Sequence, residues 1–343
     1  MLIILAVVSG ALLAACAAGP VPATSAPTEH TVNLPLAAAS APTSMPTSMP
    51  TAAPTSTPTE TPTAVPTATP APSPTPEPQV AGYAGYTVAD GDTLESIAAK
   101  SGSTPEMIRQ YNALSGEPAV GRALIVPEVA GKTGTLESEP ILVERGRSDQ
   151  PWVALTLDAG ASAAPVPQIL KTLREHNVKI TFFLTGQFIK DNPDLVRQIV
   201  ADGHEIGNHS FNHPDFRKID DATQREELDS TEALMQETSG ATTRPFFRPP
   251  FGAYNKQVLQ TVESEGYLPI YWTFDSLDSV GEPKSPAFLL ERITGHLPPE
   301  QMRGAIILAH CGSQPTADAL PQILDRFTAM GFEVKKLSEV LGT

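Results

Sequence analysis

Cysteine and positive charge are both scarce in this sequence, and each shortage limits what the protein can be. Only two of its 343 residues are cysteine, Cys16 and Cys311. If Cys16 is modified, no disulfide can form, so a buried core must hold the fold and Cys311 should be a free, buried thiol. Lysine and arginine total 23 against 38 acidic residues, which gives a formal net charge of −15. That charge argues against anionic membrane surfaces as electrostatic partners, and we expect no nucleic-acid partner.

The sequence also lacks a hydrophobic run long enough to span a bilayer. Its N-terminal stretch, MLIILAVVSGALLAAC, has about fourteen apolar or small residues, the length of a signal-peptide core. The end of this stretch, Leu13 to Cys16, resembles a bacterial lipobox. The resemblance implies that residues 1–16 are a lipoprotein signal peptide and that lipidated Cys16 anchors the protein to a membrane. A signal peptide with an incidental cysteine is the alternative, and the absence of Lys or Arg before the run fits a start further upstream.

Aromatic and branched apolar side chains are almost missing from residues 17–82, which cycle through Pro, Thr, Ala and Ser. Such a segment buries too little apolar surface to repay the entropy of ordering, and its prolines favour extended polyproline II. At about 3.1 Å per residue it could reach roughly 200 Å. We therefore predict a disordered Pro/Thr-rich linker that carries the following domains from a membrane anchor into a cell wall.

Residues 83–128 predict a small βααβ unit. The pattern indicates two strands and two helices, at Tyr86–Val88, from Asp92, from Thr104 and at Ala123–Val126. The string YTVADGDTLESIA, followed by Ile108, Asn112 and the ending LIVP, resembles LysM domains. This resemblance implies binding to peptidoglycan, chitin or another polymer that contains N-acetylglucosamine.

After a polar linker at residues 129–149, residues 150–343 predict one α/β domain. Short buried strands are indicated by WVALTL, VKITFFL, HEIGNHS, PFFRPP, LPIYWTF and AIILAH. Helical patterns separate them, at residues 167–176, 193–201, 221–238 and 255–265. Alternating strands and helices predict a parallel sheet. Because no glycine-rich nucleotide-binding sequence is present, we expect a distorted (β/α) barrel rather than an open sheet.

Polar residues at the ends of these strands are the candidates for chemistry. Asp158 follows WVALTL, where an aspartate serves as a catalytic carboxylate or simply as a turn former. His209 and His213 are four positions apart, and on one face of a helix such a pair chelates a divalent metal, although it can also be structural. Arg248, in RPPFG, can clamp a carboxylate or form an ordinary salt bridge.

Asp278 and His310 form a further candidate pair. An aspartate beside a histidine orients the imidazole and raises its pKa, which suits a general acid that protonates an amine leaving group. A buried structural histidine is the alternative, and the sequence alone cannot place the two residues in contact.

Taken in this order, the motifs resemble polysaccharide deacetylases of the NodB-homology type, carbohydrate esterase family 4, over nearly all of residues 150–343. The resemblance implies a distorted (β/α) barrel that removes acetyl groups from sugars with the help of a divalent metal. It assigns Asp158 as catalytic base, His209 and His213 as metal ligands, Arg248 as the holder of the base, the Phe251 N–H as oxyanion donor, Asp278 as the residue that tunes the acid, Leu308 as a wall of the acetyl pocket, and His310 as catalytic acid.

Two positions depart from that family's pattern. The second aspartate of its TFDDG motif, a metal ligand, is Ala159 here, and the tryptophan usual after Asp278 is Ser279. Losing a carboxylate should weaken metal binding and leave the ion more Lewis acidic. Three outcomes stay open: water fills the gap, the metal is lost, or another group coordinates it, namely Asp158, Asn208 or Asp215.

The sequence therefore predicts an exported, membrane-anchored lipoprotein that deacetylates N-acetylated cell-wall polysaccharide. The expected cofactor is zinc, with cobalt, nickel and manganese as alternatives. The competing hypothesis is a cell-wall glycan-binding protein whose barrel is catalytically weak or inactive.

Overall fold

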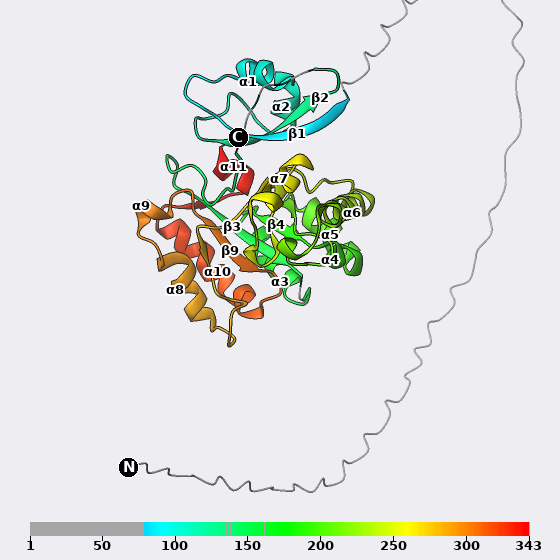
Figure 1. Cartoon of the computed structure of the whole chain (residues 1–343). Coiled ribbons are helices and arrows are strands. Elements are labelled where there is room, and N and C mark those ends of the chain that lie inside the picture. The colour runs from blue at the N-terminus through cyan, green and yellow to red at the C-terminus, as the bar shows by residue number, and fades with distance from the viewer. Residues whose placement is uncertain (1–78, 133, 135, 137–138, 161, 343) are drawn as a thin grey trace, which may run out of the picture. The chain divides into compact units, whose positions relative to one another are not determined.

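The computed structural model describes residues 79–132, 134, 136, 139–160 and 162–342 (Figure 1). The predicted signal peptide, its lipidated Cys16 and nearly all of the predicted linker lie outside the described residues. Within the described residues, no helix combines the length and the apolar character needed to cross a membrane.

The small N-terminal module has the predicted βααβ order. Its elements are β1 (Val80–Thr87), α1 (Leu94–Ser101), α2 (Pro105–Tyr111) and β2 (Ala123–Val129). The two strands pair antiparallel. β1 begins earlier than the sequence indicated, and β2 ends later. Both helices start where a threonine accepts a hydrogen bond from a backbone N–H of the first turn, Thr93 from Ser96 and Thr104 from Met107.

Asn112 joins the second helix of this module to its closing strand. Its side-chain amide donates to the carbonyl groups of Ile108 and Ile125, at 2.8 and 2.7 Å, and its carbonyl accepts from the Ile125 N–H at 2.9 Å. These buried bonds satisfy backbone groups of Ile125 on β2 and tie that strand to the end of α2. The asparagine that the sequence motif singled out thus has a structural role.

The larger domain is built on a curled parallel sheet with the order β7-β6-β5-β4-β3-β9-β8, and β10 also pairs with β3. The pairs formed by these strands run parallel. The strands are β3 (Trp152–Ala159), β4 (Thr181–Leu184), β5 (Glu205–Asn208), β6 (Phe246–Phe247), β7 (Leu268–Pro269), β8 (Phe274–Asp275), β9 (Ile306–His310) and β10 (Glu333–Val334). The predicted distorted (β/α) barrel is confirmed.

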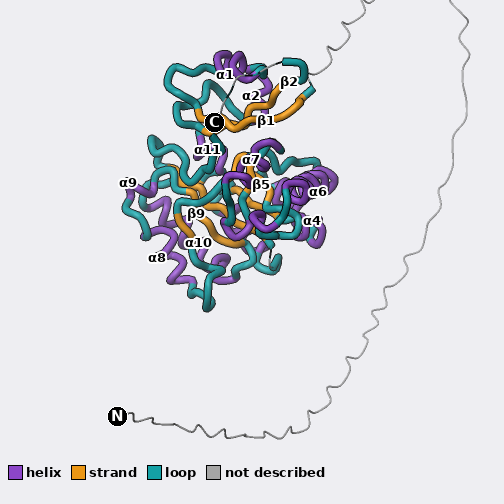
Figure 2. The backbone as a smooth tube through the Cα atoms, viewed as in Figure 1, coloured by secondary structure: helices purple, strands orange, loops and turns teal. Residues whose placement is uncertain are grey.

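Helices follow most of the strands and cover the sheet (Figures 1 and 2). They are α3 (Val166–Glu175), α4 (Gly186–Asp191), α5 (Pro193–Ala201), α6 (Asp221–Ser239), α7 (Lys256–Ser264), α8 (Pro286–Gly295), α9 (Pro299–Met302), α10 (Gln314–Ala329) and α11 (Leu337–Leu341). The four helical patterns in the sequence correspond to α3, α5, α6 and α7, with ends that agree to within a residue or so. Side-chain caps explain this agreement: Asp220 accepts from the Thr223 N–H, and Asn255 accepts from the Val258 N–H.

One strand prediction is wrong. The string LPIYWTF is not a single strand: β7 ends at Pro269 and β8 begins at Phe274. The residues between them connect the two end strands of the curled sheet, and Tyr271 and Trp272 stack there at a ring-centroid distance of 3.8 Å. The predicted strand around PFFRPP is likewise reduced to the two residues of β6.

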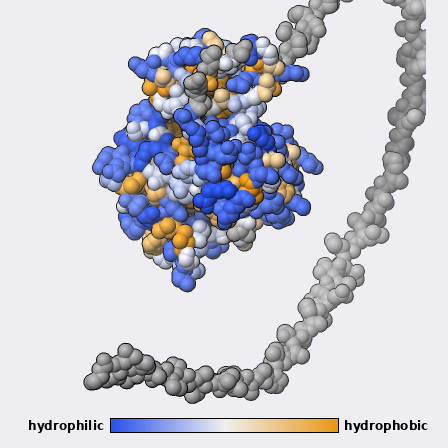
Figure 3. Space-filling view, viewed as in Figure 1, coloured by the Kyte–Doolittle hydropathy of each residue, from blue (hydrophilic) through white to orange (hydrophobic). Residues whose placement is uncertain are grey.

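The core of the larger domain lies between the central strands and the surrounding helices. Leu155, Leu157, Phe182 and Ile307 are fully buried there, together with Cys311, which is a free thiol as expected. The face in Figure 3 is mainly hydrophilic with scattered apolar patches, since the apolar side chains of this core point inward. This packing fixes the ends of β3 and β9, from which the candidate residues project.

Candidate active site

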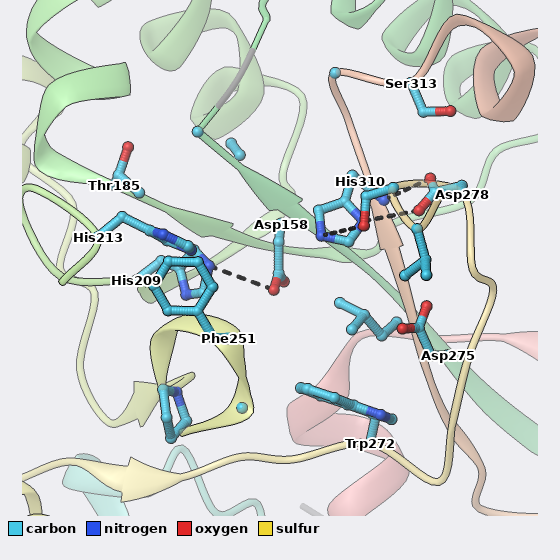
Figure 4. Close-up of a pocket in the computed structure, with 18 of the residues that line it drawn as sticks. Asp158, Thr185, His209, His213, Phe251, Trp272, Asp275, Asp278, His310 and Ser313 are labelled. Carbon is cyan, nitrogen blue, oxygen red and sulfur yellow. Dashed lines mark hydrogen bonds and ion pairs between the residues drawn. The ribbon is translucent and has the colours of Figure 1, made fainter. Parts of the chain in front are cut away.

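The carboxyl ends of the strands surround a pocket of about 860 Å³. Of the eight residues that the sequence singled out, seven line it: Asp158, His209, His213, Phe251, Asp278, Leu308 and His310. Figure 4 shows the histidine pair on one side of Asp158 and His310 with Asp278 on the other. Parallel α/β folds place ligand sites at this end of the strands, so the location agrees with a site for catalysis.

Arg248 is the eighth residue, and it lies behind the pocket with no exposed surface. Its Nη1 donates to Asp158 Oδ1 at 2.6 Å and to Thr156 Oγ1 at 2.8 Å, while Nη2 donates to the carbonyl of Tyr271 at 3.2 Å. The guanidinium also covers the ring of Phe183 at 4.0 Å. The expected contact between arginine and aspartate is therefore present, and it leaves Asp158 Oδ2 facing the pocket.

His209 directly follows β5, and its ring has a defined orientation. Nδ1 lies 2.8 Å from the carbonyl oxygen of Arg248, which can only accept a hydrogen bond, so Nδ1 carries the proton. Burial lowers the pKa of His209 to about 4, which keeps the imidazole neutral at neutral pH. Its Nε2 lone pair therefore points into the pocket, 3.5 Å from Asp158 Oδ2.

His213 reaches the same place through a loop and not through a helix. The helical condition under which this spacing brings both imidazoles to one face is not met, because Ser210 and His213 have left-handed backbones, with φ of 63° and 59°. The two rings nevertheless lie 4.8 Å apart, edge to face. The Ser210 hydroxyl accepts from the His213 N–H at 3.0 Å and helps to hold this turn.

Glu227, on α6, holds the same loop, and the sequence gave no indication of this role. Its carboxylate accepts from the N–H groups of Phe211 and Asn212 at 2.8 and 2.7 Å, and from the Asn212 side chain at 2.7 Å. Its two partners lie sixteen and fifteen positions away in the chain, so no local sequence pattern reveals the contact.

Two of the groups considered as replacement metal ligands are committed elsewhere. The Asn208 amide donates to the Leu228 carbonyl and to the Tyr267 hydroxyl, both at 3.0 Å, and its oxygen accepts from the Ser210 N–H. Asp215 caps the short 3₁₀ helix Phe216–Lys218 and pairs with Arg217 at 2.8 Å. Neither lines the pocket, so of the three side chains considered as replacement ligands only Asp158 faces it.

The possible metal ligands that remain in the pocket fit a divalent cation in part. Asp158 Oδ2 and the Nε2 of neutral His209 are both acceptors, and they face each other without a donor between them. A cation satisfies such a pair, and a histidine whose Nδ1 donates to a carbonyl is typical of metal ligands. Ala159, only 1% exposed at the end of β3, offers no donor atom. Among the described residues, no group of three or more His, Cys, Asp and Glu side chains is arranged to hold a metal.

Asp278 and His310 are in direct contact. Asp278 Oδ1 accepts from His310 Nδ1 at 2.7 Å, and Oδ2 accepts from the His310 N–H at 2.9 Å and from the Thr316 hydroxyl at 2.6 Å. Burial alone would raise the pKa of Asp278, but these hydrogen bonds hold it below its usual value. Burial would lower the pKa of His310, but the bond to Asp278 and the charge of Asp158 raise it above 6.5.

The other predicted residues form the walls. Leu308, on β9, is buried, whereas Phe251 is 71% exposed and places its ring 4.4 Å from that of His213. Phe251 has a left-handed backbone, with φ of 60°, in the turn that follows the two prolines of RPPFG. The structure adds Trp272 and Asp275 to the lining; the sequence gave Trp272 no role because it lay in a predicted strand.

Comparison with known proteins agrees with this geometry. The chain matches the polysaccharide deacetylase family over residues 145–270 and the LysM domain over residues 86–127. A peptidoglycan-N-acetylmuramic acid deacetylase of Bacillus subtilis is 30% identical over 57% of this chain and 73% of that protein. A chitooligosaccharide deacetylase of Sinorhizobium fredii is 30% identical over 57% of this chain and 95% of that protein.

Solved structures extend the likeness to proteins with and without activity. A family 4 carbohydrate esterase of Bacillus subtilis matches with a TM-score of 0.55 and 29% identity, over 58% of this chain and 84% of that one. A structure described as a pseudoenzyme of the same family, from Bacillus anthracis, matches with a TM-score of 0.55 and 29% identity, over 60% of this chain and 70% of that one. A mutant of that pseudoenzyme is described as having restored enzymatic activity.

We predict that Arg248→Met lowers the free energy of unfolding of the larger domain by about 3–5 kcal/mol, because it leaves the Asp158 carboxylate buried without its partner. Both tryptophans, Trp152 and Trp272, belong to this domain, so denaturation followed by tryptophan fluorescence reports it directly. The double variant Asp158→Asn/Arg248→Met should lose less, since no charge is left unpaired. If Arg248→Met were as stable as the parent, a buried Asp158 carboxylate without its arginine would not carry the inferred cost.

Proposed function

Because the chain belongs to the polysaccharide deacetylase family, carbohydrate esterase family 4, we propose that it removes acetyl groups from N-acetylated cell-wall polysaccharide. The observation that carries the proposal is the pocket in which Asp158, clamped by Arg248, faces His310, held by Asp278. The relatives that act on peptidoglycan and on chitooligosaccharides support this substrate class. The LysM module supports attachment to the same polymer.

The reaction uses the two faces of the pocket. Asp158 Oδ1 is occupied by Arg248, so Oδ2 takes the proton of the attacking water. The His310 proton on Nε2 is then given to the departing sugar amine, since Nδ1 is bound to Asp278. Leu308 contacts the acetyl methyl group, and the N–H of Phe251 stabilises the oxyanion. A residue of the described chain is thus assigned to each of these steps.

His209 and His213 would hold a divalent cation, zinc in our proposal, with cobalt, nickel and manganese as alternatives. When bound, such an ion polarises the acetyl carbonyl and lowers the pKa of water. Catalytic zinc sites commonly have three protein ligands, so a site with two histidines should bind more weakly.

The proposal includes anchoring as well as catalysis. Lipidated Cys16 would attach the chain to a membrane, and residues 17–82 would span the distance into the wall. Labelling cells with a fatty-acid analogue tests the anchor: the parent chain should incorporate it, and Cys16→Ser should not.

A second function has a specific observation in its favour. Ala159 removes a donor from the site, and one structural relative with this fold is described as a pseudoenzyme. A catalytically weak or inactive barrel would leave a protein that binds wall glycan through its LysM module and its pocket.

Acetate release separates the two functions. The full chain is incubated with N-acetylated chitooligosaccharides or peptidoglycan, together with zinc or cobalt. Release of acetate supports the deacetylase. Binding to peptidoglycan without acetate release under any metal supports the binding protein.

We predict that Ala159→Asp tightens zinc binding, because it adds a third ligand beside the two histidines. Isothermal titration calorimetry should show a lower Kd, by about tenfold or more. His213→Ala is the matched control and should abolish binding. An affinity unchanged by Ala159→Asp would show that another group already fills the third position.

We also predict that deacetylation slows as the pH rises through the pKa of His310. The protonated imidazole is the acid, and its pKa is raised above 6.5, so the acid form is present below that pKa and is lost above it. Asp278→Asn removes the main contact that raises this pKa. The decline in kcat/KM should then begin at a lower pH, with a maximum reduced about 100-fold. Identical pH profiles for the two proteins would show that His310 is not the acid.

A further inference from the structure

Ser279 occupies the position beside Asp278 where the family pattern has tryptophan, and its hydroxyl faces His310. Ser279 Oγ lies 3.5 Å from His310 Nε2, and Asp278 Oδ1 lies 2.7 Å from Nδ1 on the other side of the same ring. A serine hydroxyl, an imidazole and a carboxylate are thus in series, and all three residues line the pocket.

When the pH is above the pKa of His310, the protonation pattern of this series is the one that nucleophilic catalysis requires. The Asp278 side chain is fully buried and accepts three hydrogen bonds, so it remains an anion that fixes the proton of His310 on Nδ1. In neutral His310, Nε2 is then an acceptor, and the Ser279 hydroxyl is the donor that faces it. An imidazole in this tautomer can take the hydroxyl proton as general base.

The backbone places the consecutive side chains of Asp278 and Ser279 in different environments, one buried and one exposed. Leu277 has a left-handed backbone, with φ of 65°, and its N–H donates to Asp275 Oδ1 at 2.7 Å. The Asp278 N–H donates to the hydroxyl of buried Ser276 at 3.3 Å. Strained backbone of this kind persists where surrounding contacts hold it, and it is frequent at functional sites. Here it turns Asp278 inward and leaves Ser279 exposed at the pocket.

We propose that Ser279, His310 and Asp278 form a nucleophilic triad that hydrolyses acetyl esters through an acetyl-Ser279 intermediate and without a metal ion. Ser279 Oγ forms a bond to the acetyl carbon while its proton passes to His310 Nε2. The bond from the acetyl carbon to the alcohol oxygen then breaks, and the alcohol leaves with that proton. Water, deprotonated by the same Nε2, attacks the acyl group, so that acetate is released and the serine hydroxyl is restored.

The substrate class follows from the leaving group and the wall of the pocket. Alcohols leave far more readily than amines, so acetyl esters, including O-acetylated sugars, suit a triad that has no bound ion to activate the carbonyl. Leu308 lies two positions before His310 on β9 and offers an apolar wall for an acetyl methyl group. The distance of 3.5 Å is at the long end for a hydrogen bond, and such contacts shorten when substrate is bound.

This activity goes beyond the proposed deacetylation and uses different residues for its first step. Deacetylation depends on Asp158 and the histidine pair, whereas the ester reaction depends on the Ser279 hydroxyl. An assay that contains a chelator and an ester substrate therefore separates the two, because failure of either reaction leaves the other measurable.

The full chain is stripped of metal with a chelator and mixed with 4-nitrophenyl acetate. We expect a burst of nitrophenol close to one equivalent per chain, an acetyl group found on Ser279 by mass spectrometry after acid quench, and labelling of the same residue by phenylmethylsulfonyl fluoride. Ser279→Ala should abolish both adducts and lower the ester rate at least about 100-fold. Circular dichroism checks that this exposed substitution leaves the fold intact.

Ser313→Ala is the matched control, because it removes another serine hydroxyl from the same pocket. It should retain labelling at Ser279. Ser279→Cys should form a thioester in place of the ester, which tests the position of the nucleophile without removing it. Equal ester rates in the parent and Ser279→Ala, or adducts found only at other residues, would overturn the proposal.

Discussion

The buried ion pair between Arg248 and Asp158 is the contact on which the rest of the pocket depends. Arg248 uses its side chain to fix Asp158 on β3 and its backbone carbonyl to fix the ring of His209 after β5. The same guanidinium reaches the carbonyl of Tyr271, beyond β7. One residue therefore sets the relative positions of a carboxylate, an imidazole and the chain that leads to Trp272. A charge buried to this extent has to be paired, so the arrangement tolerates little change.

The sequence predicted the elements whose signals are local, and it failed where distant residues decide the structure. The ends of α6 and α7 were readable because Asp220 and Asn255 cap their own helices. The spacing of His209 and His213 suggested a helix, yet Glu227 from α6 holds a loop there. The contact between Asp278 and His310 joins residues 32 positions apart, which no local pattern reveals. Motif order supplied that information only as a resemblance.

Ala159 changes more than the number of donors in the pocket. With Oδ1 of Asp158 bonded to Arg248, only Oδ2 remains, and it faces Nε2 of His209. If Oδ2 contacts a cation, its lone pair is less available to take a proton from water, so the roles of ligand and base compete for one oxygen. A second carboxylate would remove that competition. The substitution should therefore reduce the rate of acetamide hydrolysis by more than the loss of metal affinity alone would cause.

The two departures from the family pattern, Ala159 and Ser279, both line the pocket, and in our proposals they act in opposite directions. Ala159, next to Asp158 at the end of β3, offers no metal ligand, and the proposed acetamide reaction needs an ion because amide carbonyls are poor electrophiles without one. Ser279 adds a hydroxyl to the side where Asp278 and His310 are intact, at 2.7 Å from each other. Esters need less activation than amides, so a nucleophile with its own base can act on them where the ion-dependent reaction is slow. Under the two proposals taken together, Ala159 and Ser279 favour the C–O bond of an acetyl ester over the C–N bond of an acetamide.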